Sequence, residues 1–448
     1  MSEQSARNRK RRPAPARGTA PEDTIGGELE RRVARLEFAE GALARVRVPV
    51  AGDGSDGARN VLTDMDILSI EVDARLRLSR SSLECKSGKG QSGEPMTLIW
   101  LAGFRQLMGL ERVVYVRPSV STRARALARR LDIGVLDEAT LASRESAIAW
   151  LPERFAHVDG VECTAAERRT DTQLKGLPFL RPELTAFLRY EALLADSHEI
   201  LGGLVGLGEA ADRQGSLPSP ASHILGGHAL VALLAAGLTD AGRLDHVSSS
   251  GLRQRLHRAL TTGDPDDSSL LEVLERADAV LRHVTDRTHR AYVDAGADPI
   301  QIGVPSLRDA IAAAPEYLDD YLDFVQRLRV NPLVARDLLQ TAELLCFDAL
   351  VGGSGWRAPA FARLLTAEHQ GLLLVAIRCL RSIAGEQIAS ALDPIASFFA
   401  IVAPTTVPDR RSSPHPADTR DRPAPGARND AQPGAAEQPT LIQASEDR

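Results

Sequence analysis

The chain has 448 residues, 43% of them hydrophobic and 25% charged, which is long enough for two or three globular domains. Its formal net charge of −6 excludes a polycation that coats nucleic acid, so any contact with a polyanion must come from a local basic patch. The low aromatic content of 4% favours helices that pack through Leu and Ala.

The four cysteines, Cys85, Cys163, Cys346 and Cys379, lie far apart and form no CxxC pair. This spacing predicts neither a disulfide framework nor a zinc site, and it fits a reducing cytosol. The basic N-terminus is not followed by the apolar stretch of a signal peptide. The longest apolar runs fall short of the roughly 20 residues that span a membrane. We therefore expect a soluble, cytoplasmic protein with no membrane partner.

Two terminal segments have compositions that cannot form a core. Residues 1–23 contain the basic run RKRR followed by Pro-Ala-Pro-Ala, and residues 404–448 are rich in Pro, Asp, Arg, Ala and Gln. We predict that both are disordered. The basic run is either a solvated tail or, as a more specific alternative, a tether to nucleic acid.

Residues 24–150 alternate between helical and strand patterns. Helices are predicted within residues 26–43, 94–109, 119–131 and 137–150, and the second has a proline in its first turn. Strands are predicted at residues 44–50, 64–74, 75–86, 112–116 and 133–136, with the second and third forming a meander. This order predicts an α/β domain with a mixed sheet flanked by helices.

The rest of the chain has almost no strand signal. Apolar residues three and four apart predict helices within residues 184–207, 270–296, 318–328, 332–350 and 371–390. No fixed period indicates a repeat array, so we expect a helical bundle or irregular stack. The predicted organisation is an α/β domain at 24–150, a connector at 151–180 and an all-helical domain at 181–403.

Two short motifs in the predicted meander carry acidic and basic groups. On a strand, Glu84 and Lys86 of "SLECK" share one face, while Leu83 and Cys85 share the other. If this strand pairs with "TDMDIL", Asp66 or its competitor Asp64 would lie beside Glu84. Neighbouring carboxylates repel one another unless a cation neutralises them, and Mg²⁺ binds one or two carboxylates plus waters and a substrate phosphate. A lysine at the same place can orient an attacking water or stabilise negative charge.

This arrangement resembles the PD-(D/E)xK nuclease superfamily, the restriction-endonuclease-like fold. The likeness is carried by the helix at 26–43, by "TDMDIL" and by "ECK". The segment "RVVYVRPSVSTRARALARRLDIGVLDEATL" is similar to Mrr-like members, in which a strand, a helix and a short strand close the sheet. The resemblance covers residues 24–148. Residue 65 is Met, not the Pro of the family name, and the helix after ECK lacks the Gln-x-x-x-Tyr of some exonuclease branches.

The resemblance implies a role for each motif residue. Asp66 and Glu84 would ligate a magnesium ion, for which Mn²⁺ would substitute, and the backbone carbonyl of Cys85 would be a third ligand. Lys86 would position or activate the water. Glu30 on the first helix, with Glu28 as the fallback, would act through a metal-bound water.

Basic residues near the motifs suggest contacts with phosphates. Lys89 and Arg123 are the predicted nucleic-acid-binding residues. The wider set comprises Arg75, Arg77, Arg80, Arg117, Arg125, Arg129 and Arg130. The alternative is that an arginine-rich chain carries Arg on every exposed helix face. No aromatic stacking platform accompanies these residues, so sequence readout is not visible.

Other motifs give no further chemistry. The glycines of residues 202–210 and 351–356 are not followed by a Walker lysine, so we predict no nucleotide hydrolysis, and the first cluster predicts a close helix contact or a bend. His223 and His228 are five residues apart, on different sides of a helix, which favours core or surface histidines over a metal pair.

The sequence therefore predicts a metal-dependent endonuclease that hydrolyses DNA in restriction, defence or repair, with a helical domain for regulation or partner binding. One alternative is an inactive nuclease fold that acts as a binding protein or scaffold. Another is an RNA-cleaving member of the same superfamily. A nuclease that cuts both strands often works as a homodimer, but the sequence identifies no dimer surface.

Overall fold

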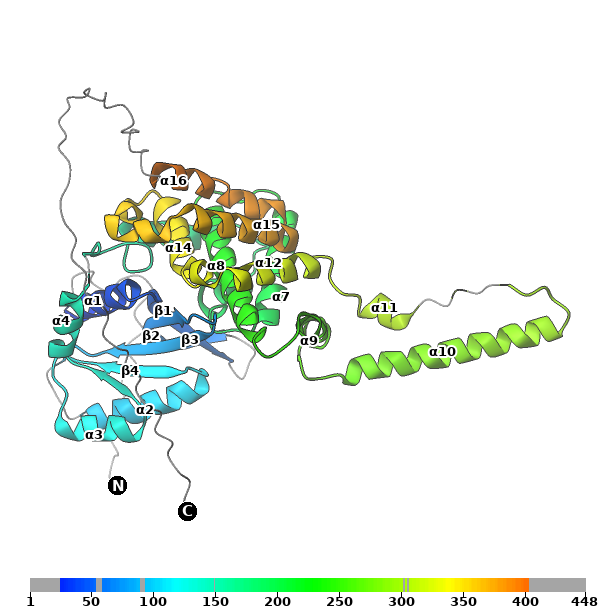
Figure 1. Cartoon of the computed structure of the whole chain (residues 1–448), viewed down its shortest axis with the longest axis horizontal. Helices are drawn as coiled ribbons and strands as arrows, with labels where there is room; N and C mark the ends of the chain where they lie inside the picture. Colours follow the sequence, from blue (N-terminus) through cyan, green and yellow to red (C-terminus); the bar gives the residue numbers. More distant parts are fainter. Residues whose placement is uncertain are drawn as a thin grey trace, which may run out of the picture. The chain divides into compact units, whose positions relative to one another are not determined.

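The structure is a computed structural model that describes residues 25–53, 59–88, 93–148, 150–300, 303 and 306–402. The two terminal segments for which we predicted disorder, 1–23 and 404–448, lie outside these residues. The described chain combines a five-stranded sheet with a larger set of helices (Figure 1).

The N-terminal part is built on one mixed sheet. Its strands, in spatial as well as chain order, are β1 (Leu43–Asp53), β2 (Arg59–Val72), β3 (Leu78–Cys85), β4 (Arg112–Val116) and β5 (Gly134–Leu136). Strands β1, β2 and β3 pair antiparallel, and β4 and β5 continue the sheet in parallel. The predicted mixed sheet and its meander are confirmed.

Four helices accompany the sheet: α1 (Ile25–Ala39), α2 (Glu94–Leu107), α3 (Thr122–Arg130) and α4 (Glu138–Ser146). The buried residues Leu29, Val33 and Leu36 recur at helical spacing and pack α1 against β1 and β2. Helix α2 contacts β4 and α3 contacts β5. The four predicted helices are confirmed.

The described chain after residue 150 contains helices and no named strand. The α-helices are α5 (Val161–Leu174), α6 (Pro182–Ala186), α7 (Ser197–Gln214), α8 (Ala221–Arg243), α9 (Ser249–Thr262), α10 (Ser269–Asp294), α11 (Leu307–Ile311), α12 (Leu318–Val330), α13 (Pro332–Ala335), α14 (Leu338–Leu344), α15 (Ala367–Ala389) and α16 (Ile395–Val402). Short π and 3₁₀ turns are η1 (Phe187–Glu191), η2 (Leu345–Ala349), η3 (Gly355–Arg357), η4 (Pro359–Leu364) and η5 (Ser390–Leu392). The predicted helical character of this part is confirmed.

Helix α8 is the centre of the helical part. It contacts α5, α7, α12, α14 and α15, and nearly all of its residues are buried. By length and composition alone it could cross a bilayer, but 89% of its apolar window is buried inside the protein. A helix that is apolar all round and covered on every side is typical of a packed core.

Two of the sequence-based expectations for this part are wrong. The helix predicted at 184–207 is divided, because Asp196 and Glu199 form a capping box that starts α7 after a turn. The segment 151–180 is more than a connector, since α5 lies within it and buries Cys163 and Ala166 in the core. The expected close contact of the 202–210 glycines is confirmed: a Cβ at Gly208 would lie 2.7 Å from the Ala384 carbonyl oxygen.

The sheet and the helices share one core. The described residues belong to one compact unit, and one buried cluster runs through both parts. The Gln340 amide donates to the carbonyls of Phe38 and Ala42, at 2.6 and 3.0 Å. Gly242 of α8 approaches so close that a Cβ would lie 2.8 Å from the Leu76 carbonyl oxygen. The predicted division into an α/β and a helical domain thus marks a change of secondary structure within a continuous core.

The contact at Gly208 gives a stability test. We expect Gly208→Val to lower the free energy of unfolding by about 1–3 kcal/mol, because the side chain would force α7 away from the backbone of α15. Urea unfolding followed by circular dichroism measures this change. Gly202→Ala is the control in the same helix, because Gly202 is exposed and has open space around it. Equal destabilisation by both changes would contradict the close packing.

Candidate functional site

Strands β2 and β3 bring the predicted acidic residues together. The last ladder pair at this end is Ile67 opposite Leu83, so Asp66 and Glu84 are the next residues on their strands. The backbone N–H of Cys85 donates to Asp66 Oδ2 at 2.8 Å. The carboxylate therefore takes the place of a backbone acceptor and is held against β3.

Lys86 completes this group. Its Nζ lies 3.6 Å from Asp66 Oδ2 and forms a closer ion pair with Glu84 Oε1. The side chain of Glu84 is 9% exposed and that of Lys86 43% exposed, so Glu84 is buried and not on an open strand face. Leu83 and Cys85 are buried too. Asp64 is exposed and lies opposite Pro49 of β1, which favours Asp66 over Asp64.

The electrostatics of these residues follow from burial and proximity. Burial raises the pKa of Glu84, and the charge of Asp66 raises it further against the opposing effect of Lys86. Burial alone would lower the pKa of Lys86, but its hydrogen bond to Glu84 and the charge of Asp66 raise it above its ordinary value. Two neighbouring carboxylates thus share one ammonium group.

Glu30 of α1 also lies near this group. Burial raises its pKa although Arg47 opposes the shift, and the charge of Asp66 contributes in the same direction as burial. Arg47 Nε donates to Glu30 Oε2 at 2.8 Å, so Glu30 is engaged in an ion pair. The fallback residue Glu28 is exposed.

Arg47 is a residue that the sequence reasoning missed. The flanking pairs Val46–Ile67 and Val48–Met65 place it opposite Asp66 in the sheet. Its φ of 56° lies in the left-handed region, which is rare for a residue other than glycine and often marks a functional position. No motif signals it, because the signal is the backbone conformation and the register.

Half of the arginines predicted around the site have other partners in the structure. Arg117 is buried with Glu94 at 3.4 Å, Arg80 donates to the Leu193 carbonyl, and Arg77 and Arg125 pair with acidic residues. Arg123 is exposed on α3, and no hydrogen bond or ion pair within the described residues joins it to Asp66, Glu84 or Lys86. Lys89 lies outside the described residues. Arg77, Arg80, Arg117 and Arg125 therefore have partners within the fold, whereas Arg75, Arg129 and Arg130 are exposed.

A second polar group lies between β1 and the helices, and we call it the buried ring. It consists of Arg45, His157, Glu167, His228 and Glu343. Arg45 pairs with Glu343 at 2.9 Å, and Glu343 contacts His157 Nδ1 at 2.5 Å. His157 Nε2 lies 3.3 Å from Glu167 Oε1, which also contacts His228 Nε2 at 2.8 Å. A contact of 3.4 Å between Arg45 Nη1 and His228 Nδ1 closes the ring.

The partners fix the protons in the ring. A guanidinium can only donate, so His228 Nδ1 accepts from Arg45 and its Nε2 carries the proton that goes to Glu167. Both nitrogens of His157 face carboxylates, so both donate and this imidazole is charged. Two positive and two negative groups then balance, and Arg189 and Asp171 add a further balanced pair beside Glu167.

The pKa shifts agree with this assignment. Burial lowers the pKa of His228 to about 3. Burial would also lower the pKa of His157, but Cys163 and Glu343 raise it well above its ordinary value. Because burial raises the pKa of the Cys163 thiol and keeps it neutral, the charge that acts on His157 is that of Glu343. Burial opposes the shift of Glu343, yet Arg45 and His157 lower its pKa to about 2.

Two groups of residues offer ligands to a metal. Among the described residues, His157, Glu167 and His228 place one ligand atom each within 4.8 Å of one another. A dication there would have to displace two protons from a set whose charges already balance, so these residues fit a structural network better than a metal site. Asp66 and Glu84 instead share one cation, the ammonium of Lys86. Their carboxylate oxygens are the donor type that Mg²⁺ prefers. The Cys85 carbonyl as a ligand stays a prediction.

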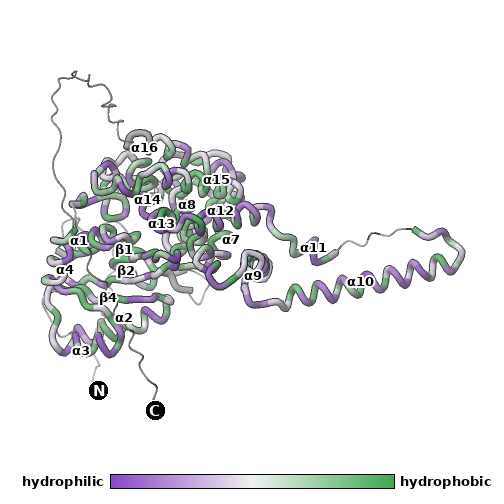
Figure 2. The backbone as a smooth tube through the Cα atoms, viewed as in Figure 1, coloured by the Kyte–Doolittle hydropathy of each residue, from purple (hydrophilic) through white to green (hydrophobic). Residues whose placement is uncertain are grey.

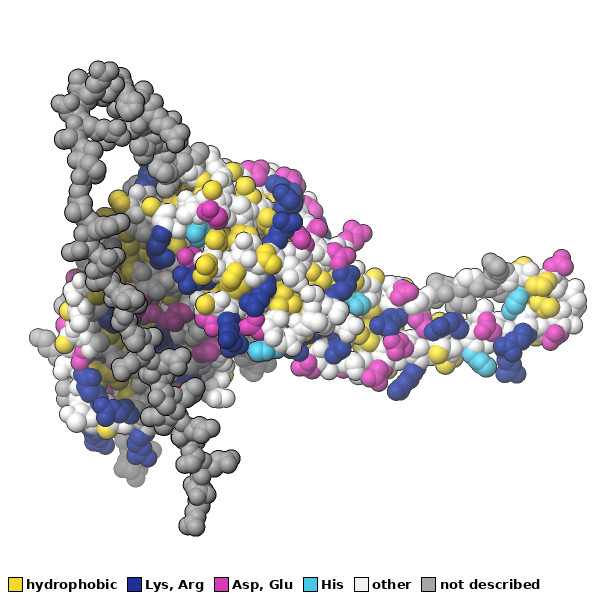
Figure 3. All heavy atoms as spheres, viewed as in Figure 1, with side chains coloured by type: hydrophobic (Ala, Val, Ile, Leu, Met, Phe, Trp, Pro, Cys, Tyr) yellow, Lys and Arg dark blue, Asp and Glu magenta, His cyan; other side chains and the backbone are white. Residues whose placement is uncertain are grey.

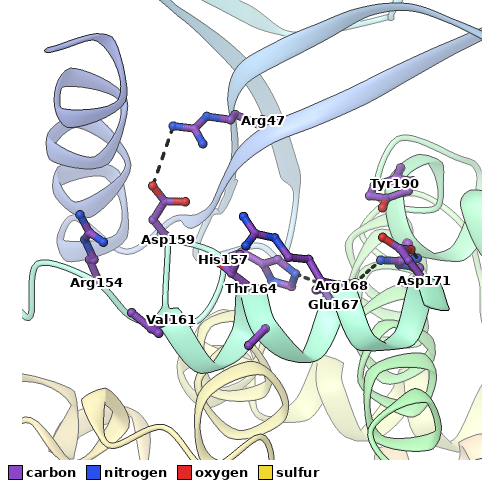
Figure 4. Close-up of a pocket in the computed structure, with 12 residues that line it drawn as sticks. Arg47, Arg154, His157, Asp159, Val161, Thr164, Glu167, Arg168, Asp171 and Tyr190 are labelled. Atoms are coloured by element: carbon purple, nitrogen blue, oxygen red, sulfur yellow. Dashed lines mark hydrogen bonds and ion pairs between the residues drawn. The ribbon is translucent and has the colours of Figure 1, made fainter. Parts of the chain in front are cut away.

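A cleft of about 400 Å³ adjoins the buried ring (Figure 4). Its lining residues are Arg47, Arg154, His157, Asp159, Val161, Thr164, Ala165, Glu167, Arg168, Asp171, Arg189 and Tyr190. Figure 4 shows Arg47 pointing from β1 toward Asp159. Arg47 Nη2 lies 3.9 Å from Asp159 Oδ2. Because Arg47 also binds Glu30, it connects this arginine-rich cleft with the carboxylates around Asp66.

Comparisons with protein-family models, with curated proteins and with solved structures found no match to this chain. The functional argument therefore rests on the geometry of the two groups of residues described above.

The buried ring predicts a specific pH dependence of stability. His228 has a pKa of about 3 in the folded state and about 6.5 when unfolded, so the unfolded chain binds the extra proton between these values. The contribution of neutral His228 to the free energy of unfolding is therefore lost as the pH falls below 6.5. In His228→Gln we expect the free energy of unfolding to fall less steeply with falling pH, by up to about 1.4 kcal/mol per pH unit.

Chemical denaturation at several pH values between 4 and 7 measures this slope. His283→Gln is the matched control, because His283 is exposed on α10. An unchanged slope in His228→Gln would show that His228 takes up a proton in the folded protein and would contradict the assignment.

Proposed function

We propose that this chain is a metal-dependent nuclease that hydrolyses phosphodiester bonds in DNA. One observation carries the proposal: the ammonium of Lys86 contacts both Asp66 and Glu84 where the ladder between β2 and β3 ends. The five-stranded mixed sheet around it is compatible with the PD-(D/E)xK resemblance of residues 24–148. DNA as the substrate rests on the analogy with that superfamily.

The residues present fit a hard divalent cation. Asp66 and Glu84 are close enough for the charge of Asp66 to raise the pKa of Glu84, and a cation relieves that repulsion. Asp66 and Glu84 would hold Mg²⁺ or Mn²⁺, with the Cys85 carbonyl as a third ligand. The ion would neutralise charge on the phosphate and lower the pKa of a bound water.

Lys86 is the residue that acts on the reacting atoms. In hydrolysis one P–O bond forms to the water oxygen and another breaks, the water loses a proton, and the leaving oxygen gains one. The raised pKa of Lys86 keeps its ammonium charged, so it stabilises negative charge on the phosphate and orients the water. Glu30 and Arg47 support this group from α1 and β1.

The arginine-rich cleft supplies positive charge beside the carboxylates. Arg47 lines the cleft and also binds Glu30, so phosphates that flank the scissile bond would pass from the carboxylate group into the cleft. Such contacts make binding depend on salt, because each neutralised phosphate releases counterions. The protein would act in restriction, defence or repair, and the helices that form one wall of the cleft would control access to it.

The central test compares Asp66→Asn and Lys86→Ala with the wild type, using the full chain because the sheet and the helices share one core. Substrates are supercoiled plasmid, linear duplex, single-stranded DNA and RNA, each with Mg²⁺, Mn²⁺ or chelator. We expect metal-dependent cutting of DNA that falls by at least about 10²-fold in both variants, because each loses a group that stabilises the transition state.

Asp64→Asn is the matched control, since Asp64 is exposed on the same strand and we expect it to keep activity. Binding of Mn²⁺, followed by electron paramagnetic resonance, should weaken in Asp66→Asn and not in Asp64→Asn. Cutting of RNA alone would move the assignment to the RNA-cleaving alternative. If no substrate is cut and Asp66→Asn binds Mn²⁺ as the wild type does, the scaffold alternative replaces the nuclease.

A further inference from the structure

A second cavity adjoins the arginine-rich cleft. Its volume is about 520 Å³, and the two cavities share Arg168, Asp171 and Arg189. The second cavity adds the lining residues Leu174, Lys175, Leu180, Pro182, Thr185 and Ala186. Asp171 and Arg189 pair at 2.6 Å where the cavities meet, and the side chain of Arg189 is only 5% exposed. Arg189 therefore lies beneath the two cavities and not across their mouths, and together they form one groove, which we call the α5 groove.

The α5 groove follows the helix after which it is named. Figure 4 shows α5 running below the cleft from Val161 to Asp171, with Arg47 of β1 above it. Beyond Asp171 the second cavity continues along the same helix to Lys175. From residue 161 to residue 175 the helix axis rises roughly 21 Å. The groove is therefore elongated, and Arg47 places it beside the candidate active site, because Arg47 also binds Glu30.

The groove is basic although the chain is acidic. The chain as a whole has a formal net charge of −6. Five basic residues line the groove against three acidic ones, namely Arg47, Arg154, Arg168, Lys175 and Arg189 against Asp159, Glu167 and Asp171. Arg168 and Lys175 are exposed and lie seven residues apart, roughly 10 Å along the helix axis. Positive groups repeated along a groove match the repeated charges of a nucleic-acid backbone.

Two other surfaces of the molecule differ from the groove. Helix α10 carries four arginines against five acidic residues. Figure 2 shows hydrophobic and hydrophilic residues alternating along α10, and Figure 3 shows acidic and basic side chains interspersed on it. Helix α3 carries exposed arginines, but it contacts α2 and β5, and β5 is the edge of the sheet opposite β1. The α5 groove combines a hollow shape, an excess of basic residues and a connection to the carboxylates through Arg47.

The dimensions of the groove favour one strand over a duplex. Its two cavities, of about 400 and 520 Å³, have the size that encloses small ligands. A duplex is instead contacted over roughly 1,000–2,500 Å² of protein surface. Tyr190 lines the groove and is half-buried, and the guanidinium of Arg189 lies over its ring, 5.2 Å from the centroid. An aromatic ring in a basic groove suits a single strand, because every unpaired base has a face that can stack on it.

We infer that the α5 groove binds a single strand of DNA that leads to the carboxylates around Asp66. The inference rests on the proposed function and specifies its substrate, which is single-stranded DNA or a duplex with a single-stranded tail. Phosphates of the strand pair with Arg168 and Lys175, and one base stacks on Tyr190.

The test measures binding by the fluorescence anisotropy of a labelled DNA strand, alone and annealed to its complement. The full chain is used with chelator present, so that nothing is cut. We expect the single strand to bind at least about 10-fold more tightly than the duplex. Arg168→Ala and Lys175→Ala should each weaken this binding and make the slope of log K against log[salt] shallower by about 0.7, because each loses one phosphate contact. Arg169→Ala is the matched control, because Arg169 is exposed beside Arg168 and does not line the groove.

Tyr190 tests the stacking contact separately. Tyr190→Ala is expected to weaken binding of the single strand by at least about 5-fold and to leave the salt slope unchanged, because the lost contact is uncharged. Tyr190→Phe keeps the ring and should bind as the wild type does. Circular dichroism checks that each variant is folded.

The outcomes separate this inference from the proposed function. Equal affinity for the strand and the duplex, or an equal loss in Lys175→Ala and Arg169→Ala, would overturn the inference. A chain that cuts DNA while the groove variants keep the wild-type affinity would retain the nuclease and overturn the groove. A chain that binds the strand through Lys175 and Tyr190 but cuts nothing would support the groove as a binding site and overturn the nuclease.

Discussion

The buried ion pair between Arg45 and Glu343 is the constraint on which the rest of the structure depends. Glu343 is fully buried and Arg45 is 5% exposed, and an unpaired charge at such depth would be strongly destabilising. The pair is stable because His157, Glu167 and His228 complete a ring in which every charge has a partner. The five residues come from β1, the loop before α5, and helices α5, α8 and α14, so one network fixes the sheet against the helices.

This fixed position of β1 determines the surroundings of the candidate active site. Arg47 follows Arg45 by two residues, lies opposite Asp66 and binds Glu30. On the other edge of β2, Asp66 accepts the Cys85 N–H and shares Lys86 with Glu84. The carboxylates thus lie between β1, which the buried ring holds in place, and the residue that follows β3, Lys86. The arginine-rich cleft begins where these two systems meet, at Arg47.

Helices α8 and α10 differ in how far their apolar residues are buried. Helix α8 is apolar on all sides and is enclosed by other helices of the same chain. Helix α10 is apolar along one stripe, its other faces carry charged residues, and among the described elements α11 packs against it.

The sequence by itself determined the elements and the chemistry of the motifs, because periodicity and strand alternation are local properties. It predicted the mixed sheet, the meander and the grouping of Asp66, Glu84 and Lys86, since neighbouring strands in a meander pair next to each other. It could not predict the buried ring, because Arg45 and Glu343 are 298 residues apart and carry no local pattern. The pairing of Arg77, Arg117 and Arg125 with acidic residues of the fold has the same cause. Which charges face one another is decided only when distant segments pack, and that packing also left the stripe of α10 open.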